Sequence, residues 1–255
     1  MKPAMILCLI LVGGISVWRS ALGSTPSSGV AVVELFTSEG CSSCPPAERL
    51  LGELARDAEH DGRPVFTLAF HVDYWNGLGW ADRFSDPAFS QRQRDYARTL
   101  HVDEIYTPQM VVNGTTQFVG SDRDGAARAI AGALAGQSAV TMTVQVNGNK
   151  RDGYTVHATT KGAGAGAVVN IAVVERGLAT DVKSGENKGR RLEEPSVVRW
   201  FKSVPLSDAG TVIVPPLAAV QTEHTSVIVY TQQPGNGPIF GAAATSLPAT
   251  VPSQP

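Results

Sequence analysis

The spacing of apolar residues divides the chain into two stretches of different character. From residue 29 to about 135, apolar runs of strand length alternate with segments whose apolar residues recur every three or four positions. From residue 140 onward, short runs alternate apolar and polar residues without a helical period, which is typical of strands. We therefore expect an α/β N-terminal domain over residues 28–136 and an all-β sandwich-like C-terminal domain over residues 138–245.

The first stretch predicts the element order β-α-β-α-β-β-α. Strands are expected at residues 29–37, 65–72, 106–112 and 115–119. Helices are expected from Ser42 or Ser43, from Asp86-Pro87 and from Ser121, because proline and capping residues favour a first helical turn. Asn113-Gly114 between the last two strand-like runs predicts a tight hairpin.

The second stretch predicts a sandwich of about seven short strands. A charged segment, Arg176–Pro195, interrupts it, and a loop of this length is usually functional or disordered. The polar tail 246–255 is expected to have no regular structure.

The first 23 residues have the pattern of a secretion signal. A single lysine precedes an apolar run from Ala4 to Trp18, and Ala21-Leu22-Gly23 supplies small residues for cleavage. An uncleaved membrane anchor is the alternative, although the run is short for a span. We therefore expect a secreted or periplasmic protein with no membrane attachment after signal cleavage.

Composition excludes some partners. The formal net charge of −2 gives no reason to expect binding to nucleic acid or to anionic lipid. No phosphate-binding loop, dinucleotide-binding glycine pattern or serine-hydrolase elbow is evident. The sequence does not predict an oligomeric state.

Removal of the signal leaves two cysteines, Cys41 and Cys44, in a compartment where disulfides persist. A disulfide across so short a loop adds little stability, so a chemical role is the better interpretation. The start of a helix favours a thiolate, which makes Cys41 the candidate nucleophile. Cys44 would resolve a mixed disulfide, and the expected partners are protein thiols or disulfides.

The arrangement of a strand, a CxxC turn and a helix, followed by Thr107-Pro108 before a hairpin strand, resembles the thioredoxin fold. This resemblance implies a cis peptide bond at Pro108 beside the cysteines and a substrate contact at Thr107. More narrowly, VVELFTSEGCSSCPPAE, YTPQMVVNG, GENKGR and GPIFGAA look like the DUF1223 family of secreted proteins of about this length. That family implies a thioredoxin-like fold and no particular substrate.

One position departs from the thioredoxin pattern. Thioredoxins carry a buried acid six residues before the first cysteine, where this chain has Leu35, with Glu34 one place earlier. A shift by one residue turns a strand side chain to the other face of the sheet. An ordinary edge or satisfied carboxylate is therefore the better interpretation of Glu34, and a role as proton acceptor for Cys44 is the alternative.

Two further groups could reach the cysteines. Trp75 and Trp80 follow the second buried strand and could form an apolar rim that binds a peptide substrate, and we take Trp75 as the candidate for substrate binding. Packing between the two domains is the alternative for both. Glu186 and Arg190 could reach the same face, or belong to a solvated charged loop.

Two alternatives to disulfide exchange stay open. A structural zinc site needs four ligands, and the chain has no second CxxC, so no metal or other cofactor is expected. The same cysteines could instead carry Cu(I), and a lone histidine such as His71 is more often structural than a ligand. The third hypothesis is a binding protein whose disulfide has no catalytic role.

Overall fold

The computed structural model describes residues 27–138, 140–217 and 219–248. The helices in this part are α1 (Pro45–His60), α2 (Pro87–Thr99) and α3 (Arg123–Ala135), with short 3-10 turns at Leu206–Asp208 and Thr222–His224. The strands are β1 (Ser27–Ser28), β2 (Ala31–Thr37), β3 (Val65–His71), β4 (Gln109–Val112), β5 (Thr116–Val119), β6 (Gln137–Ser138), β7 (Thr141–Asn149), β8 (Gly153–Lys161), β9 (Val168–Glu175), β10 (Leu178–Asp181), β11 (Arg191–Glu194), β12 (Val197–Pro205), β13 (Val212–Val214), β14 (Thr225–Gln232) and β15 (Ile239–Ser246). The predicted signal 1–23 and residues 249–255 of the predicted tail lie outside the described residues.

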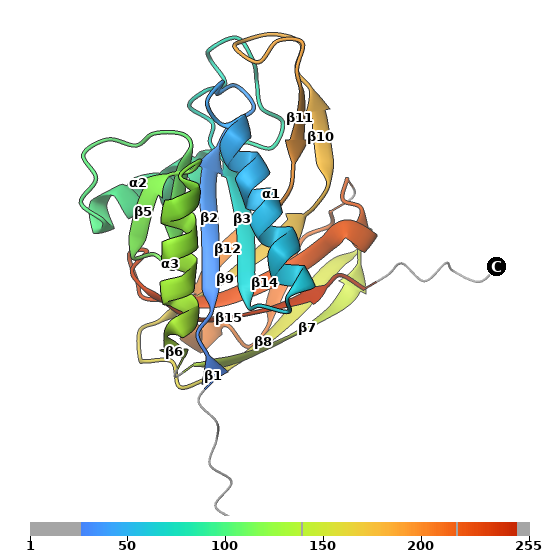
Figure 1. Ribbon diagram of the computed structural model, residues 1–255. Helices are drawn as coiled ribbons and strands as arrows, with labels where there is room; N and C mark the ends of the chain where they lie inside the picture. Colours follow the sequence, from blue (N-terminus) through green and yellow to red (C-terminus); the bar gives the residue numbers. More distant parts are fainter. Residues whose placement is uncertain (1–26, 139, 218, 249–255) are drawn as a thin grey trace, which may run out of the picture.

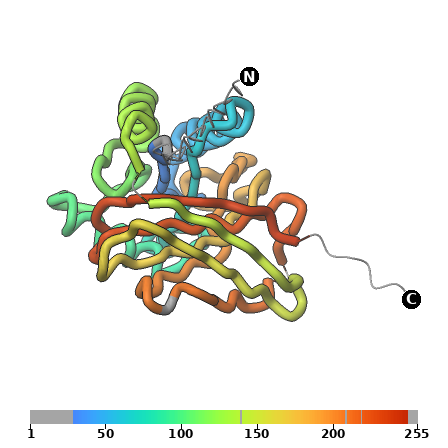
Figure 2. Tube along the Cα trace, turned by 90° about the horizontal axis from the view of Figure 1, so that it is seen from below, coloured from blue at the N-terminus to red at the C-terminus, as the bar shows by residue number. Residues whose placement is uncertain are grey.

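One mixed eight-stranded sheet runs through the molecule in the order β15-β14-β9-β12-β3-β2-β4-β5. A second sheet has three strands, in the order β13-β8-β7, and two short pairs join β1 with β6 and β10 with β11. Figure 1 shows α1 and α3 in front of β2 and β3, with β7 and β8 below them. Figure 2, seen from below, shows the second half of the chain as stacked strand layers.

The predicted fold class, a thioredoxin-like α/β domain with a separate β-sandwich, is wrong. β12 pairs in parallel with β3 at Val197 and Ala69, so the sheet of the first half continues into the second half. Ser196 extends the junction, because its carbonyl accepts the amide of Ala69 at 2.7 Å and its hydroxyl lies 2.9 Å from Thr67 Oγ1. β12 thus covers the edge that β3 would otherwise expose. The domain limits predicted at 28–136 and 138–245 concern folding units and stay a prediction.

The side chains of β2 alternate between two apolar layers. Val33 and Leu35 pack with residues of α1 and α3. Val32 and Phe36 point to the other face, where they join side chains of α2, β9 and β14. A third apolar cluster lies between the three-stranded sheet and the outer strands of the large sheet. β2 is therefore buried on both faces.

The start of α2 follows the expected chemistry, whereas α1 and α3 begin later than predicted. α3, expected from Ser121, begins at Arg123 with Asp122 as its N-cap. Asp86 caps α2 by accepting the amide of Ala88 at 2.8 Å, and Pro87 occupies the first helical position. α1 begins at Pro45 with Cys44 as its N-cap, later than the predicted start at Ser42 or Ser43. Cys41 therefore lies one turn before the helix.

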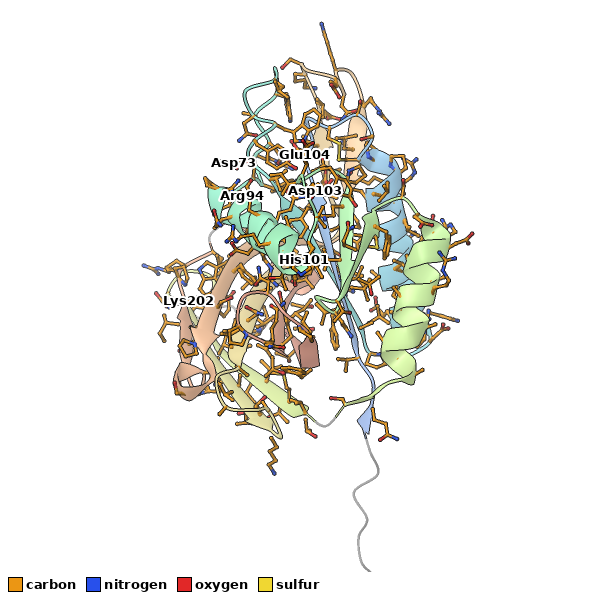
Figure 3. All side chains as sticks on the ribbon, turned by 90° about the vertical axis from the view of Figure 1, so that its left-hand side faces the viewer. Asp73, Arg94, His101, Asp103, Glu104 and Lys202 are labelled. Atoms are coloured by element: carbon orange, nitrogen blue, oxygen red, sulfur yellow. A yellow bond between two sulfur atoms is a disulfide. The ribbon has the colours of Figure 1, made fainter. Side chains whose placement is uncertain are left out.

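The faces of α2 differ sharply in character. Arg92 is buried towards the sheet, whereas Arg94 is exposed. Figure 3 shows Arg94 on the outer side of the helix, with Asp73 above it. α2 therefore presents a charged outer surface and buries one arginine in the core.

The charged segment Arg176–Pro195 contains a hairpin. β10 and β11 pair from Leu178 with Glu194 to Asp181 with Arg191, and residues 182–190 form the tip. Figure 1 places the hairpin beside the start of α1, next to the CxxC turn. The predicted loop thus brings residues of the second half to the first helix.

Candidate functional site

Cys41 and Cys44 form a disulfide, with their Cα atoms 5.4 Å apart. Cys44 is the N-cap of α1, and its amide donates to the carbonyl of Cys41 at 3.3 Å. Both cysteines are 0% exposed, whereas Ser42 and Ser43 between them are exposed. The disulfide therefore lies beneath the surface at the start of a helix.

The tip of the β10–β11 hairpin covers the CxxC turn. The buried amide of Asn187 donates to the carbonyl of Glu39 at 2.9 Å and to that of Cys41 at 3.0 Å. Glu186 accepts the backbone N–H of Ser42 at 3.1 Å, and these hydrogen bonds to Ser42 lower the pKa of the Glu186 carboxyl. Arg190 holds Asn187 by donating to its Oδ1 at 2.8 Å. Glu186 thus contacts the CxxC turn at Ser42, and Arg190 acts on the turn through Asn187.

Trp75 and Trp80, the two tryptophans predicted to lie near the cysteines, also reach this turn. A side chain on Gly40 would meet the Cβ of Trp75 at 3.3 Å, and the indole N–H of Trp75 donates to Thr107 Oγ1 at 2.8 Å. The indole of Trp80 donates to Glu39 Oε2 at 2.7 Å. Trp75 therefore links the CxxC turn to the Thr107–Pro108 segment.

The peptide bond between Thr107 and Pro108 is cis. Pro108 is buried, and Gly120 places it beside α1. A Cβ on Gly120 would lie 3.0 Å from the Cβ of Ala47 and 3.1 Å from the Cβ of Pro108. The structure thus brings Trp75, Thr107 and Pro108 to the side of the helix start where the disulfide lies.

Glu34 lies elsewhere. Its carboxylate accepts Arg92 Nη2 at 2.7 Å and the hydroxyl of Tyr230 at 2.5 Å, on the face of the sheet that α2 covers. Arg92 is enclosed by the rings of Phe70, Tyr96, Phe201 and Tyr230. The pair joins α2 to β2 and β14, which favours the alternative of a satisfied structural carboxylate.

A group of five buried ionisable side chains lies behind the CxxC turn. We refer to Glu39, Glu48, His71, Asp82 and Glu194 as the acid–imidazole cluster, and each of them is at most 4% exposed. His71 is its centre, with Nδ1 2.7 Å from Asp82 and Nε2 3.5 Å from Glu194. Thr37 donates to Glu48 at 2.6 Å, while neither carboxylate oxygen of Glu194 has a hydrogen-bond partner.

Burial and mutual charge shift the pKa values of the cluster. Burial raises the pKa of the Glu48 carboxyl to about 7. Burial, and then the charge of Glu48, raise the pKa of Glu194. Burial alone lowers the pKa of His71, but Asp82 and then Glu194 raise it to about 10. His71 in return lowers the pKa of Asp82 despite burial, so those two form an ion pair.

No metal centre accompanies this arrangement. Among residues 27–138, 140–217 and 219–248, no group of three or more His, Cys, Asp or Glu side chains is arranged to hold a metal ion. Both ring nitrogens of His71 face carboxylates, so the histidine is not directed at the cysteines as a copper ligand. None of the helices in the described part is long and apolar enough to cross a membrane.

Sequence reasoning missed most of the residues behind and above the disulfide. Glu39 stands two residues before Cys41 and Glu48 four residues after Cys44, so their closeness in sequence was a usable signal. Asn187 and Glu194 come from more than 140 residues away, and no local pattern indicates that they would lie here.

Comparison with known proteins gives a family and a related structure. The model of the family described as "Protein of unknown function (DUF1223)" matches residues 32–232. The crystal structure of protein AGR_C_4864 from Agrobacterium tumefaciens is 29% identical with a TM-score of 0.61, covering 89% of this chain and 99% of that one. A domain of the outer membrane lipoprotein Omp28 from Porphyromonas gingivalis is 12% identical with a TM-score of 0.25, covering 43% of this chain and 88% of that one. The search of curated proteins finds no match.

Proposed function

Because the chain belongs to the DUF1223 family, whose description names no activity, we propose a function from its own residues: thiol–disulfide exchange with proteins through Cys41 and Cys44. The observation that carries the proposal is the disulfide that these two cysteines form at the start of α1. A disulfide across two intervening residues adds little stability, so stabilisation of the fold alone does not account for the disulfide. Thiol–disulfide exchange requires two neighbouring cysteines of this kind and therefore explains the pair.

The proposed reaction is a balanced two-step exchange. A substrate thiolate bonds to the sulfur of Cys41, the Cys41–Cys44 bond breaks, and Cys44 leaves and takes up a proton. A second substrate thiolate then displaces Cys41, which leaves as a thiolate near the positive end of α1. The substrate is oxidised to a disulfide and the protein is reduced to a dithiol; the reverse sequence reduces a substrate disulfide.

Substrate access requires the hairpin tip to move, because both cysteines are covered. When residues 182–190 swing away, the wall formed by Trp75, Thr107 and Pro108 becomes the surface on which an extended peptide binds. The hydrogen bonds named above join Asn187 and Glu186 to the turn, so few bonds must break for such a movement, which supports it. The expected secretion signal places this chemistry in a compartment where disulfides persist.

The test is transfer of the disulfide to a reduced, unfolded protein that contains cysteines. The oxidised wild-type protein should consume substrate thiols, and Cys41→Ser or Cys44→Ser should abolish the transfer. Lys188→Ala, at an exposed position of the hairpin tip, is the control and should retain it. No transfer by the wild type or by Asn187→Ala, in which the cover is loosened, would refute the proposal.

A further inference from the structure

The acid–imidazole cluster contains more negative charge than a buried site tolerates. With all groups ionised, four carboxylates would face one imidazolium, since Glu39, Glu48, Asp82 and Glu194 surround His71. Asp82 and Glu194 both face the ring of His71, but one imidazolium neutralises only one of the four charges, which leaves an excess of three negative charges in the buried region. Unpaired buried carboxylates take up protons instead.

Glu48 and Glu194 are the members best placed to hold such a proton. Glu194 is 0% exposed and its two oxygens have no hydrogen-bond partner, so its carboxyl is free to share one. The charges of Glu48 and Glu194 act on each other across the contact of α1 with β11. Burial raises the pKa of Glu39 as well, but Glu39 accepts the indole N–H of Trp80 and lines neither of the two cavities described below.

Glu48 is also next to the disulfide. Its backbone N–H donates to the carbonyl of Cys44 at 3.2 Å, and the two side chains are four residues apart on the buried face at the start of α1. Residues at this spacing are neighbours on a helix, with Cβ atoms about 5–6 Å apart. Thr37, which donates to Glu48, fixes the carboxyl at the end of β2, beneath the CxxC turn.

Two surface cavities border Glu48 and Glu194, which are themselves at most 1% exposed. Glu48 contributes to a cavity of about 110 Å³, and Glu194 contributes to a neighbouring cavity of about 430 Å³. Both lie along the seam between α1 and the β10–β11 hairpin. The other charged residues that line them, all outside the buried cluster, are Arg49, Glu53, Arg56, Glu59, Arg176, Arg191 and Glu193. A proton lost from the pair can therefore be replaced from water.

We propose that Glu48 and Glu194 share a proton in the oxidised protein and that this proton passes to the Cys44 sulfur when the Cys41–Cys44 bond breaks. The incoming thiolate bonds to Cys41, the electron pair of the broken bond goes to Cys44, and the carboxyl proton converts Cys44 to a thiol. The carboxyl is left as a carboxylate and is reprotonated through the cavities. In the reverse direction the carboxylate takes the proton from Cys44. This role rests on the proposed exchange at Cys41 and Cys44, but its chemistry is testable with a small dithiol.

The first experiment measures the rate of reduction of the disulfide by dithiothreitol against pH, expressed per dithiothreitol thiolate. The wild-type rate should be constant in acid and fall above about pH 7 as the shared proton is lost. Glu48→Gln should be at least tenfold slower at pH 6 and should lose this inflection, since general acid catalysis contributes roughly 10²- to 10⁴-fold. Asp57→Asn, on the same helix but exposed and outside both cavities, should match the wild type within about twofold.

The second experiment follows the carboxyl carbons of the oxidised protein by ¹³C NMR. Glu48 and Glu194 should titrate together near neutrality, and Glu194→Gln should move the Glu48 midpoint to lower pH because a neighbouring negative charge is removed. The same variant should move the inflection of the rate profile in the same direction. A structural role alone would not produce these paired shifts.

The inference is overturned if Glu48→Gln keeps the wild-type inflection, whether or not its rate falls, or if the two carboxyls titrate independently in the acid range. Failure of the proposed function gives a different result. In that case the dithiothreitol profile and the NMR titration appear as described, while no disulfide passes to a protein substrate.

Discussion

The amide of Asn187 donates a hydrogen bond of 3.0 Å to the backbone carbonyl of Cys41, across 146 positions of the sequence. A second bond from the same amide reaches the carbonyl of Glu39. The oxidised disulfide is therefore closed off by a side chain from the other half of the chain. Access to the sulfurs depends on breaking these two bonds.

Asn187→Ala should make the disulfide react faster. Loss of the amide removes both hydrogen bonds and leaves the covered state less stable by about 1–3 kcal/mol, which corresponds to roughly 5- to 150-fold in the population of the open state. The measurement is the rate of reduction by dithiothreitol at fixed pH. Lys188→Ala changes an exposed neighbour and should leave the rate unchanged. Equal rates in all three proteins would show that the tip does not limit access.

The sequence did not predict the hairpin tip over the disulfide or the acid–imidazole cluster behind it. The apolar runs and helical periods located β2, β3 and α2 to within a few residues, because those signals are local. The pairing of β3 with β12 is not local: Val197 follows Ala69 by more than 100 residues, and the run after Ser196 reads like any short strand. Burial is also not predictable from the local sequence at Glu194. The charged segment around it suggested a solvated loop, but residues of α1 and β3 enclose its side chain. For Glu34, the one-residue shift did indicate the correct face of β2.

The hairpin turn at Gly114 packs closely against the backbone of Gly237, and Gly114→Ala should disrupt this contact. Gly114 has φ of +66°, and a Cβ there would lie 2.3 Å from the carbonyl oxygen of Gly237. Gly62 has a similar φ of +61° but no atom within 4 Å of its Cβ position, so Gly62→Ala is the matched control. Left-handed backbone should cost each variant about 1–2 kcal/mol, and the clash should cost Gly114→Ala about 1–3 kcal/mol more. Urea unfolding would measure the difference, and equal losses would contradict the close contact.

The ion pair of Arg92 with Glu34 should be structural. Arg92→Ala leaves the buried carboxylate of Glu34 unpaired and should lower the free energy of unfolding by about 3–5 kcal/mol. Arg98, on the same helix, has a 68% exposed side chain paired with Asp95, so Arg98→Ala should cost at most about 1 kcal/mol. Chemical unfolding of both variants checks this. A small loss for Arg92→Ala would mean that the aromatic rings around it, rather than the charge pair, hold α2 in place.

The acid–imidazole cluster should make the protein less stable as pH rises. The folded-state pKa of Glu48 is about 7 against an ordinary value of 4.5, so the folded protein binds more protons than the unfolded chain between these values. That contribution is complete below about pH 4.5 and is lost by about pH 7, a change of about 3 kcal/mol. His71, with its pKa raised from 6.5 to about 10, extends the decline to higher pH.

Glu48→Gln should remove the part of this decline that lies between about pH 4.5 and pH 7. The free energy of unfolding, measured with urea at half-unit intervals of pH, gives the slope for each protein. Glu53→Gln, one turn further along the helix, should keep the wild-type slope. An unchanged slope in Glu48→Gln would mean that the Glu48 carboxyl does not hold a proton in the folded state near neutrality.

The most direct measurement traps Cys41 with a protein partner. Cys44→Ser removes the resolving thiol, so incubation with a small disulfide-bonded protein should give a stable mixed disulfide through Cys41, visible by intact mass spectrometry. Cys41→Ser, which keeps Cys44 at the N-cap of α1, should form at least tenfold less adduct under the same conditions. No adduct with Cys44→Ser, or equal adduct with both variants, would contradict an exchange reaction led by Cys41.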